Sequence, residues 1–380
     1  MNAVADLFAR NEFEELITTV RERIGSDRRS LTDPDIKRWC GQRWRALFLS
    51  EAQRDERAVK VATRLLDKRP IRQRLAERFL AEDIDDWRLK LPSPTTTTVN
   101  SALMFVPGFV HRAIPVPGLE DLEPVGEQFN TSVVRADTHP VRSSEANVAD
   151  VLGAMDATNG EDVVMFGYSK GAIDALTVLA KKPEAAARVR ALVCWAGAVG
   201  GSPIGDDALN KLSEIEVEAI FDNQLAMAFL KALLPIAQLE GMIERPDEWD
   251  LRGALTDLST AHRDRFDADY GPAIDALDIP IFNVVAKTSP REVPYFQLQG
   301  CLDIGKRIGP NDMQVAVVDQ QVTTPMGTTL AVCHAHHWDL ALGPFPLTHR
   351  LGSQNLDNPF PRRAAVTATV LLLAELGLLD

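Results

Sequence analysis

Short apolar runs separated by helical patterns dominate the chain after about residue 100. The runs cover residues 102–106, 132–136, 163–166, 191–195, 279–285 and 315–318. Runs of this length that alternate with segments of helical spacing are typical of a parallel sheet, whose strands are buried on both faces and connected by crossover helices. We therefore predict an α/β fold with a mostly parallel sheet flanked by helices.

The first ninety residues or so have a different pattern, with apolar positions at helical spacing. Asp33 and Pro34 supply an N-cap and a proline at the first helical position, so a helix is expected to begin there. We predict a separate, helical N-terminal region over residues 1–91. A linker is predicted over residues 92–100, because prolines and a run of threonines interrupt the apolar period. Residues 101–380 then form the second domain.

A long insertion interrupts the sheet pattern between the runs 191–195 and 279–285. It has little strand character, and its residues 221–239 are strongly apolar. A structureless connection of this length is uncommon inside a compact domain, and long insertions often form lids. We predict a helical cap at about 203–277 that covers one edge of the sheet. An ordinary core helix in the crossover connection is the alternative.

Residues 167–171 read G-Y-S-K-G and join an apolar run to a helical pattern. A strand, a tight G-x-S-x-G turn and a helix place the serine hydroxyl on a strained bend at the start of the helix. An ordinary glycine–serine turn is the alternative. We take Ser169 as the candidate nucleophile, which needs a base to accept its proton. The histidines that follow the last strand-like region are His334, His336 and His337.

The chain at this point resembles the α/β-hydrolase superfamily, and within it the lipase- and esterase-like serine hydrolases. Residues 336–342, H-H-W-D-L-A-L, are similar to the end of those enzymes, where the catalytic histidine precedes an aromatic or apolar run entering a helix. The resemblance implies that His337 is the base, with His336 where an aspartate is frequent. It covers about residues 100–380 and implies the α/β-hydrolase fold with a helical cap and a helical N-terminal extension.

The resemblance also implies an acid that orients the histidine. No carboxylate stands directly after the run 279–285, where the acid is common in these enzymes. Asp312, in G-P-N-D-M-Q-V, resembles the Asn-Asp-Gly-x-Val acid loop of bacterial lipases, with Met313 in place of glycine. Asp312 is therefore our first choice, although an aspartate after asparagine is also common in solvated turns. The other candidates are Glu292, Asp206 and Asp207.

An oxyanion hole needs two backbone N–H groups aimed at the developing negative charge. In a G-x-S-x-G turn one of them belongs to the residue after the serine, here Lys170. The loop at 105–110, F-V-P-G-F-V, follows an early strand. By resemblance Phe109 supplies the second N–H, and Gly108 lets the backbone come close. A simple proline–glycine turn is the alternative.

Composition narrows the remaining possibilities. The chain has 380 residues, a net charge of −13 and four cysteines without C-x-x-C spacing. The acidic balance argues against nucleic acid as a partner, and the cysteines predict neither a disulfide framework nor a zinc site. The histidine cluster lacks i, i+4 spacing, so we expect no metal and no other cofactor. The apolar stretch at 364–379 is too short to span a bilayer, so we expect a buried closing helix.

The start of the chain lacks the pattern of a signal peptide, so we expect a cytoplasmic protein without stable membrane insertion. The resemblance implies a serine hydrolase that cleaves a carboxylic ester, a small molecule or a lipid-like compound. The apolar cap favours a hydrophobic acyl group. Two alternatives stay open: an acyltransferase of the polyester-synthase type, whose relatives usually carry cysteine in the turn, and a non-catalytic binding protein with this fold. We expect residues 1–90 to be dispensable for hydrolysis of a small ester, and the oligomeric state stays open.

Overall fold

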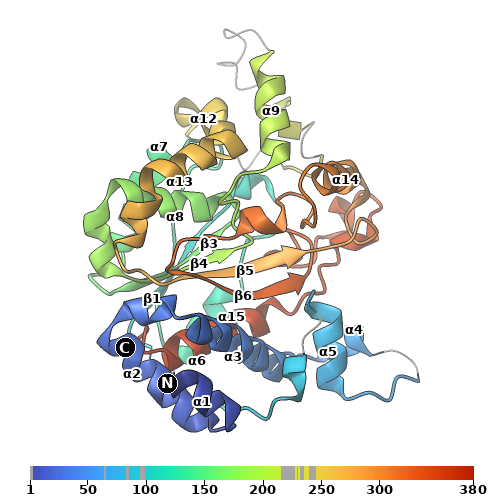
Figure 1. Ribbon diagram of the computed structural model, residues 1–380. Helices are drawn as coiled ribbons and strands as arrows, with labels where there is room; N and C mark the ends of the chain where they lie inside the picture. Colours follow the sequence, from blue (N-terminus) through green and yellow to red (C-terminus); the bar gives the residue numbers. More distant parts are fainter. Residues whose placement is uncertain are drawn as a thin grey trace.

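The computed structural model describes residues 3–63, 66–82, 85–94, 99–214, 227–228, 230–231, 235–238 and 245–380. In this part of the chain, six parallel strands form one sheet in the order β2-β1-β3-β4-β5-β6 (Figure 1). The strands are β1 (Ala102–Val106), β2 (Val133–Arg135), β3 (Val163–Tyr168), β4 (Val189–Trp195), β5 (Ile281–Lys287) and β6 (Gly327–His334). The protein thus has the predicted parallel α/β sheet.

Five of the six apolar runs correspond to strands, and the sixth prediction was wrong. Residues 315–318 belong to a turn and to the 3-10 helix η8 (Val317–Gln320), whereas the last strand is β6. Strand β6 lies at the edge of the sheet and pairs only with β5 among the described strands. It begins with a glycine and two threonines, which precede a short apolar centre. Val315 is apolar for another reason, because it packs against Ile173 and Ala198 beside the start of α8 (Lys170–Lys181).

Helices cover both faces of the sheet (Figure 1). One face packs against α7 (Ser144–Asp156), α8 and α13 (Thr260–Asp275). The other packs against α3 (Pro34–Ala52), α6 (Leu122–Phe129) and α15 (Arg362–Glu375). Burial on both faces explains why strands such as β3 read as continuous apolar runs. Helix α15 is the expected closing helix, and no helix in the described ranges is long and apolar enough to cross a membrane.

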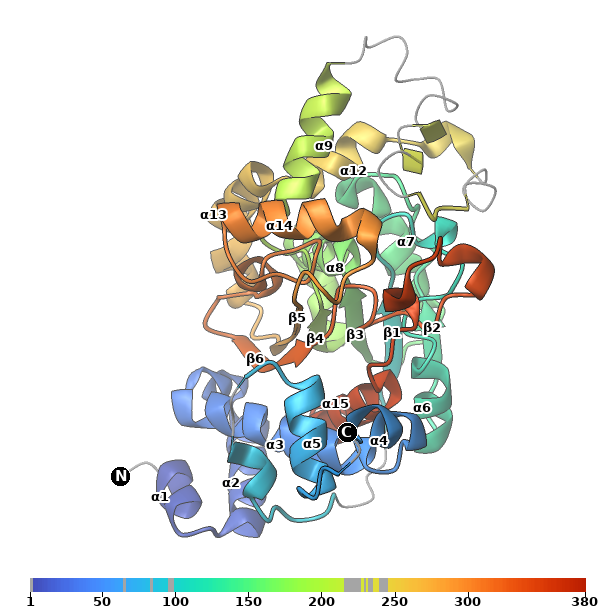
Figure 2. The same cartoon turned by 90° about the vertical axis from the view of Figure 1, so that its right-hand side faces the viewer.

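The N-terminal residues are helical, but they do not form a region apart. Their helices are α1 (Ala3–Ala9), α2 (Phe13–Ser26), α3, α4 (Glu56–Ala62) and α5 (Ile71–Phe79). Figure 2 shows them on the same side of the sheet as α15, opposite α9 (Pro203–Ser213) and α12 (Leu251–Asp257). Helix α3 begins as predicted, with the Asp33 carboxylate accepting a hydrogen bond from the Asp35 N–H at 2.9 Å.

Contacts between α3 and α15 correct the expectation of a separate region. Arg43 is 1% exposed and forms an ion pair of 2.5 Å with Glu375, whose side chain is also buried. The indole N–H of Trp44 donates to the Thr369 hydroxyl at 2.8 Å. Phe48 stacks on Phe360. A helix that places arginine, tryptophan and phenylalanine in the core shared with the sheet is a layer of that core, so its removal would expose the face it covers.

The cap formed by the insertion between β4 and β5 contains fewer residues than the predicted range 203–277. Helices α9 and α12 lie beyond the carboxyl end of the sheet. Helix α13 instead packs Phe266 and Ile274 into the core, on the same face as α7 and α8. Because α13 is the crossover helix, the cap does not extend to 277. Much of the apolar segment 221–239 falls outside the described residues. Within its described part, Leu230 and Ile236 are buried together with Leu255 of α12.

Candidate active site

The G-Y-S-K-G residues form a tight turn between β3 and α8. Ser169 has φ 55° and ψ −123°, a conformation that is strained for a residue with a side chain. A Cβ on Gly171 would lie 2.0 Å from the Val106 carbonyl oxygen, and one on Gly167 would lie 2.6 Å from the Ala172 Cα. Both positions therefore require glycine. The turn places the Ser169 side chain at the carboxyl end of the sheet, where open parallel sheets bind ligands.

His337 and Asp312 meet at the same end of the sheet. The imidazole Nδ1 lies 2.7 Å from Asp312 Oδ2, and the two side chains are 2% and 0% exposed. Asp312 stands in the loop between α14 (Leu298–Arg307) and β6, and His337 follows β6. The second carboxylate oxygen of Asp312 accepts the backbone N–H groups of Gln314 and Val315 at 2.9 and 2.8 Å. The carboxylate is thus fixed by three hydrogen bonds.

Met313 occupies the glycine position of the loop and has a φ of 83°. Its backbone N–H donates to the Asn311 side chain at 2.9 Å, which stabilises a conformation that glycine adopts more readily. The His337 N–H donates to the Asp312 carbonyl oxygen at 2.9 Å. Side chain and backbone contacts therefore join Asp312 and His337 in a loop that carries methionine at this position.

Tyr168 is a site residue that the sequence reasoning missed. Its ring lies 5.1 Å from the His337 ring, and its hydroxyl donates to the His337 carbonyl oxygen at 3.2 Å. Burial, with a contribution from Asp312, holds the tyrosine pKa well above its usual range, so the hydroxyl stays a donor. The only signal in the sequence was an aromatic residue at the second position of the G-x-S-x-G motif.

Ser169 and His337 line one cavity of about 570 Å³. The backbone of the loop after β1 passes beside the serine, because a Cβ on Gly108 would lie 3.0 Å from the Ser169 Cβ. The neighbouring Phe109 also lines this cavity. Within the described residues, neither the Phe109 nor the Lys170 backbone N–H donates to another protein group. The apolar part of the wall includes Ile114, Leu230, Leu255, Trp338 and Leu342.

The other acid candidates lie elsewhere. Glu292 Oε2 is 2.7 Å from His334 Nε2 and accepts the Ser289 hydroxyl at 3.0 Å. The contact with His334 lowers the pKa of Glu292 to about 2. Asp206 accepts the Thr260 N–H and hydroxyl, and Asp207 pairs with Arg307 at 2.9 Å. None of these three carboxylates has a hydrogen bond to His337 in the described structure.

His336 has a different environment from its neighbour. Its Nε2 lies 2.7 Å from the Asn355 carbonyl oxygen, and its Nδ1 accepts the Asp339 N–H at 3.1 Å. Burial lowers the pKa of His336 and so favours its neutral form, although the contacts with Asp339 and the Asn355 carbonyl oxygen act in the opposite direction. In the described ranges, no three His, Cys, Asp or Glu side chains are grouped so that they could hold a metal ion.

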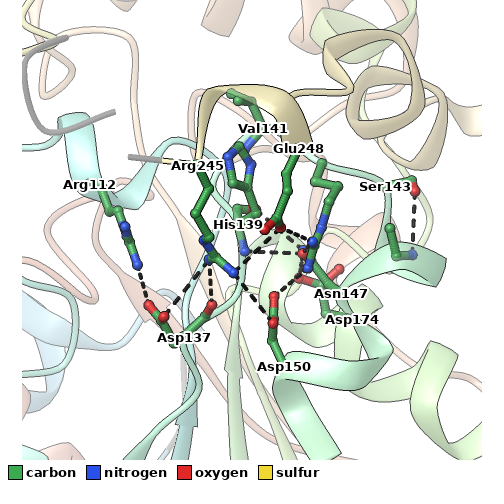
Figure 3. A network of polar contacts seen from close by, with 12 residues as sticks. Arg112, Asp137, His139, Val141, Ser143, Asn147, Asp150, Asp174, Arg245 and Glu248 are labelled. Atoms are coloured by element: carbon green, nitrogen blue, oxygen red, sulfur yellow. Dashed lines mark hydrogen bonds and ion pairs between the residues drawn. The ribbon is translucent and has the colours of Figure 1, made fainter. Parts of the chain in front are cut away.

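A polar network that the sequence did not indicate lies at the base of the cap (Figure 3). Arg245 donates to the Asp137 carbonyl oxygen at 2.8 Å and lies 3.5 Å from both Asp150 and Glu248. Arg142 forms ion pairs with the same two carboxylates. Residues 245–250 of the insertion are thereby attached to α7 and to the loop after β2. The partners come from two segments far apart in the sequence, residues 137–150 and 245–248, which is why spacing along the chain gave no signal.

Comparisons with known proteins support the fold. No protein-family model matches the chain, and no curated protein matches it by sequence. Among solved structures, the metagenomic carboxyl esterase MGS0156 superposes with a TM-score of 0.64 at 22% identity, over 87% of this chain and 91% of that one. The mature Bacillus licheniformis lipase BlEst2 superposes with a TM-score of 0.46 at 17% identity, over 66% of this chain and 88% of that one. Staphylococcus hyicus lipase superposes with a TM-score of 0.42 at 11% identity, over 75% of this chain and 96% of that one.

The extent of the first superposition is informative about the N-terminal helices. Residues 101–380 are less than 87% of the chain, so the aligned part reaches into residues 1–100. The helical layer that contains α3 is therefore partly shared with the esterase structure. At 22% identity, the TM-score of 0.64 shows likeness of fold alone, and the mostly parallel sheet flanked by helices agrees with the α/β-hydrolase fold.

Proposed function

We propose that this protein is a serine hydrolase that cleaves carboxylic esters. One observation carries the proposal: the strained Ser169 and the buried pair His337–Asp312 come from three loops at one end of the sheet, and the serine and histidine line the same cavity. Nucleophile, base and orienting acid are recognised by geometry and role. The likeness of the fold to that of a carboxyl esterase agrees with this chemistry.

In the proposed mechanism the Ser169 hydroxyl attacks the ester carbonyl while His337 Nε2 accepts its proton. Asp312 accepts a hydrogen bond from the Nδ1–H, which holds the required tautomer and stabilises the imidazolium. The N–H groups of Phe109 and Lys170 bind the oxyanion. His337 then gives the proton to the leaving alcohol. Water, deprotonated by the same histidine, releases the acid from the acyl-enzyme.

The walls of the cavity support a hydrophobic substrate. Leu230 and Leu255 from the cap, together with Ile114 and Trp338, would surround the ester with aliphatic and aromatic carbon. Burial of such groups contributes roughly 0.8 kcal/mol per CH₂. We therefore propose an ester with an acyl chain or another apolar group. No step of this mechanism requires a cofactor.

A fluorophosphonate probe with matched serine variants tests the proposal. The probe should label the wild type and not Ser169→Ala, and the alanine variant should lose at least about 10⁴-fold in ester turnover, as expected for removal of a nucleophile. Ser202→Ala is the matched control, because Ser202 lines the same cavity but bonds to the Gln314 carbonyl oxygen and caps α9. Labelling that persists in Ser169→Ala would refute the assignment. A wild type without labelling or turnover would favour a binding protein.

A further inference from the structure

The side chain of Lys170, the residue after the proposed nucleophile, is buried beneath the turn. It is 2% exposed, and its ammonium lies 2.6 Å from Asp174 Oδ1 and 3.0 Å from the Ser144 hydroxyl. Asp257 Oδ2 lies at 3.9 Å. A buried ammonium is costly unless it is paired and hydrogen-bonded, so this lysine is held by a site built around it.

The three partners of Lys170 belong to three different elements. Asp174 is one turn further along α8, Ser144 begins α7, and Asp257 ends α12 of the cap. The Ser144 N–H donates to Asp257, so the cap carboxylate also contacts α7. The ammonium therefore stands where the start of α8, the start of α7 and the cap meet.

The contacts continue into the network at the base of the cap. Asp174 Oδ2 accepts a hydrogen bond from the Asn147 amide at 3.1 Å, and Asn147 in turn accepts one from Arg142 at 3.1 Å. Figure 3 shows Asn147 and Asp174 at the edge of the ion pairs of Arg245. The side chain next to the proposed nucleophile and the attachment of the cap are thus joined by one chain of polar contacts.

These side-chain contacts matter for the proposed chemistry because the backbone N–H of Lys170 is a proposed oxyanion donor. Lys170 is the first residue of α8 and directly follows the strained Ser169. Strained backbone persists only where the surroundings hold it in place. An oxyanion donor has to lie within a few tenths of an ångström of its productive position. A side chain anchored on three elements restrains the N–H of its own residue.

We propose that Lys170 is a positioning residue of the oxyanion hole, and that its contact with Asp257 couples the position of α12 to the turn. The inference rests on the proposed esterase function. Two carboxylates and a hydroxyl surround the ammonium, so the lysine acts through the geometry of its backbone and not as a free charge beside the substrate. The Asp257 side chain is the only contact of the ammonium from the described part of the cap.

Lys170→Met tests the proposal, because methionine keeps an unbranched side chain and removes the charge. We expect kcat for a p-nitrophenyl ester to fall about 10- to 100-fold with little change in KM, since the oxyanion forms only in the transition state. Lys182→Met is the matched control: Lys182 caps the other end of α8 and is exposed, so its variant should keep kcat within about two-fold.

A transition-state analogue separates positioning from a general structural effect. Ser169 Oγ adds to the carbonyl carbon of a trifluoromethyl ketone, its proton passes to His337, and the carbonyl oxygen becomes an oxyanion in the hole. We expect the affinity for this ketone to fall in Lys170→Met by the same factor as kcat/KM. The corresponding secondary alcohol has no carbonyl and should bind wild type and variant equally. Equal weakening for both compounds would overturn the proposal.

Asp257→Asn keeps the inference testable if Lys170→Met does not fold. The asparagine oxygen still accepts the Ser144 N–H, and the change removes the charge that faces Lys170 at 3.9 Å and His262 Nε2 at 3.5 Å. We expect kcat to fall about three- to ten-fold, less than for loss of the ammonium itself. Glu248→Gln is the control for cap attachment in general, because Glu248 pairs with Arg142 and lies outside the contacts of Lys170. Unchanged kcat in Asp257→Asn, or an equal fall in both variants, would overturn the coupling.

The wild-type measurement distinguishes failure of the inference from failure of the proposed function. A wild type that hydrolyses the ester and reacts with the fluorophosphonate, beside a folded Lys170→Met variant of unchanged kcat, would refute the role of Lys170 alone. A wild type that does neither would refute the esterase function, and the inference would fall with it.

Discussion

Two imidazole–carboxylate pairs lie at the carboxyl ends of β5 and β6, and they have the same contact distance. His337–Asp312 and His334–Glu292 are each joined at 2.7 Å. The side chains of the first pair are 2% and 0% exposed, and those of the second 31% and 39%. Of these two histidines, His337 lines the cavity that contains Ser169, and His334 does not. Contact distance alone therefore does not identify a catalytic pair.

Burial changes what the same contact can do. Asp312 is fixed by two backbone N–H groups and has one oxygen left for His337, so the imidazole has a single orientation. Glu292 also accepts the Ser289 hydroxyl and faces Arg78 at 3.8 Å across a partly exposed surface. Water screens such a pair and competes for its hydrogen bonds. The buried pair is therefore the one for which we propose the orienting role.

The largest effect should come from removing the two histidines in turn. His337→Ala should lower kcat/KM by at least about 10⁴-fold, as loss of a general base does in a serine hydrolase. His334→Ala should stay within about two- to three-fold, because a partly exposed side chain outside the cavity has no contact with the reacting atoms. Steady-state hydrolysis of one ester by both variants gives the comparison. Equal losses would mean that the exposed pair takes part in catalysis.

Removing the charges of Asp312 and Glu292 in turn should give a slightly smaller difference in turnover. Asp312→Asn keeps the shape of the side chain but no longer stabilises the imidazolium, so kcat should fall about 10³- to 10⁴-fold. Glu292→Gln should leave turnover within about two-fold, since Glu292 has no contact with His337. Turnover of both variants is measured beside the rate of fluorophosphonate labelling. If Glu292→Gln were the slower enzyme, the acid would have been assigned to the wrong loop.

The fold was largely predictable because it repeats one local rule. Strands β1, β3, β4 and β5 are buried almost throughout and read as apolar runs, and β2, a half-buried edge strand, was located from the same kind of run. Strand β6 was missed because a glycine and two threonines occupy its first three positions. The N-terminal region was predicted as helical, but its place in the core depends on pairs such as Arg43–Glu375, whose members are 332 residues apart. No local pattern indicates such a pair.

The candidate site was predictable to a different degree for each residue. Ser169 stands in a motif whose glycines are required by close backbone approach, so the sequence alone located it. The choice of Asp312 over Glu292 relied on resemblance, because both carboxylates sit in loops at the same end of the sheet and each contacts a histidine. From the sequence, Lys170 was predicted only as the donor of a backbone N–H to the oxyanion hole. Two partners of its buried side chain, Ser144 on α7 and Asp257 on α12, have no sequence signal of their own.

A third pair extends the comparison from catalysis to stability. Arg43–Glu375 is 1% and 5% exposed at 2.5 Å, whereas Arg54–Glu51 is 70% and 14% exposed at 2.6 Å. Arg43→Met should lower the free energy of unfolding by about 3–5 kcal/mol, because it leaves a buried carboxylate without a partner. Arg54→Met should cost no more than about 0.5 kcal/mol. Urea unfolding followed by circular dichroism measures both. Similar losses would contradict the view that burial decides the effect.

The smallest effect is expected at Glu292 and depends on pH. The contact with His334 lowers the pKa of Glu292 to about 2, below the value of about 4.3 for an unfolded chain. Because the folded-state pKa is the lower one, the carboxylate stabilises the fold above about pH 4.3, and this contribution is lost as the pH falls towards 2. Solvent screening of a side chain that is 39% exposed limits the contribution to less than about 1 kcal/mol. Wild type should therefore exceed Glu292→Gln slightly in unfolding free energy at pH 7, with the gap closing near pH 2. A gap that widened on acidification would reverse the assigned sign.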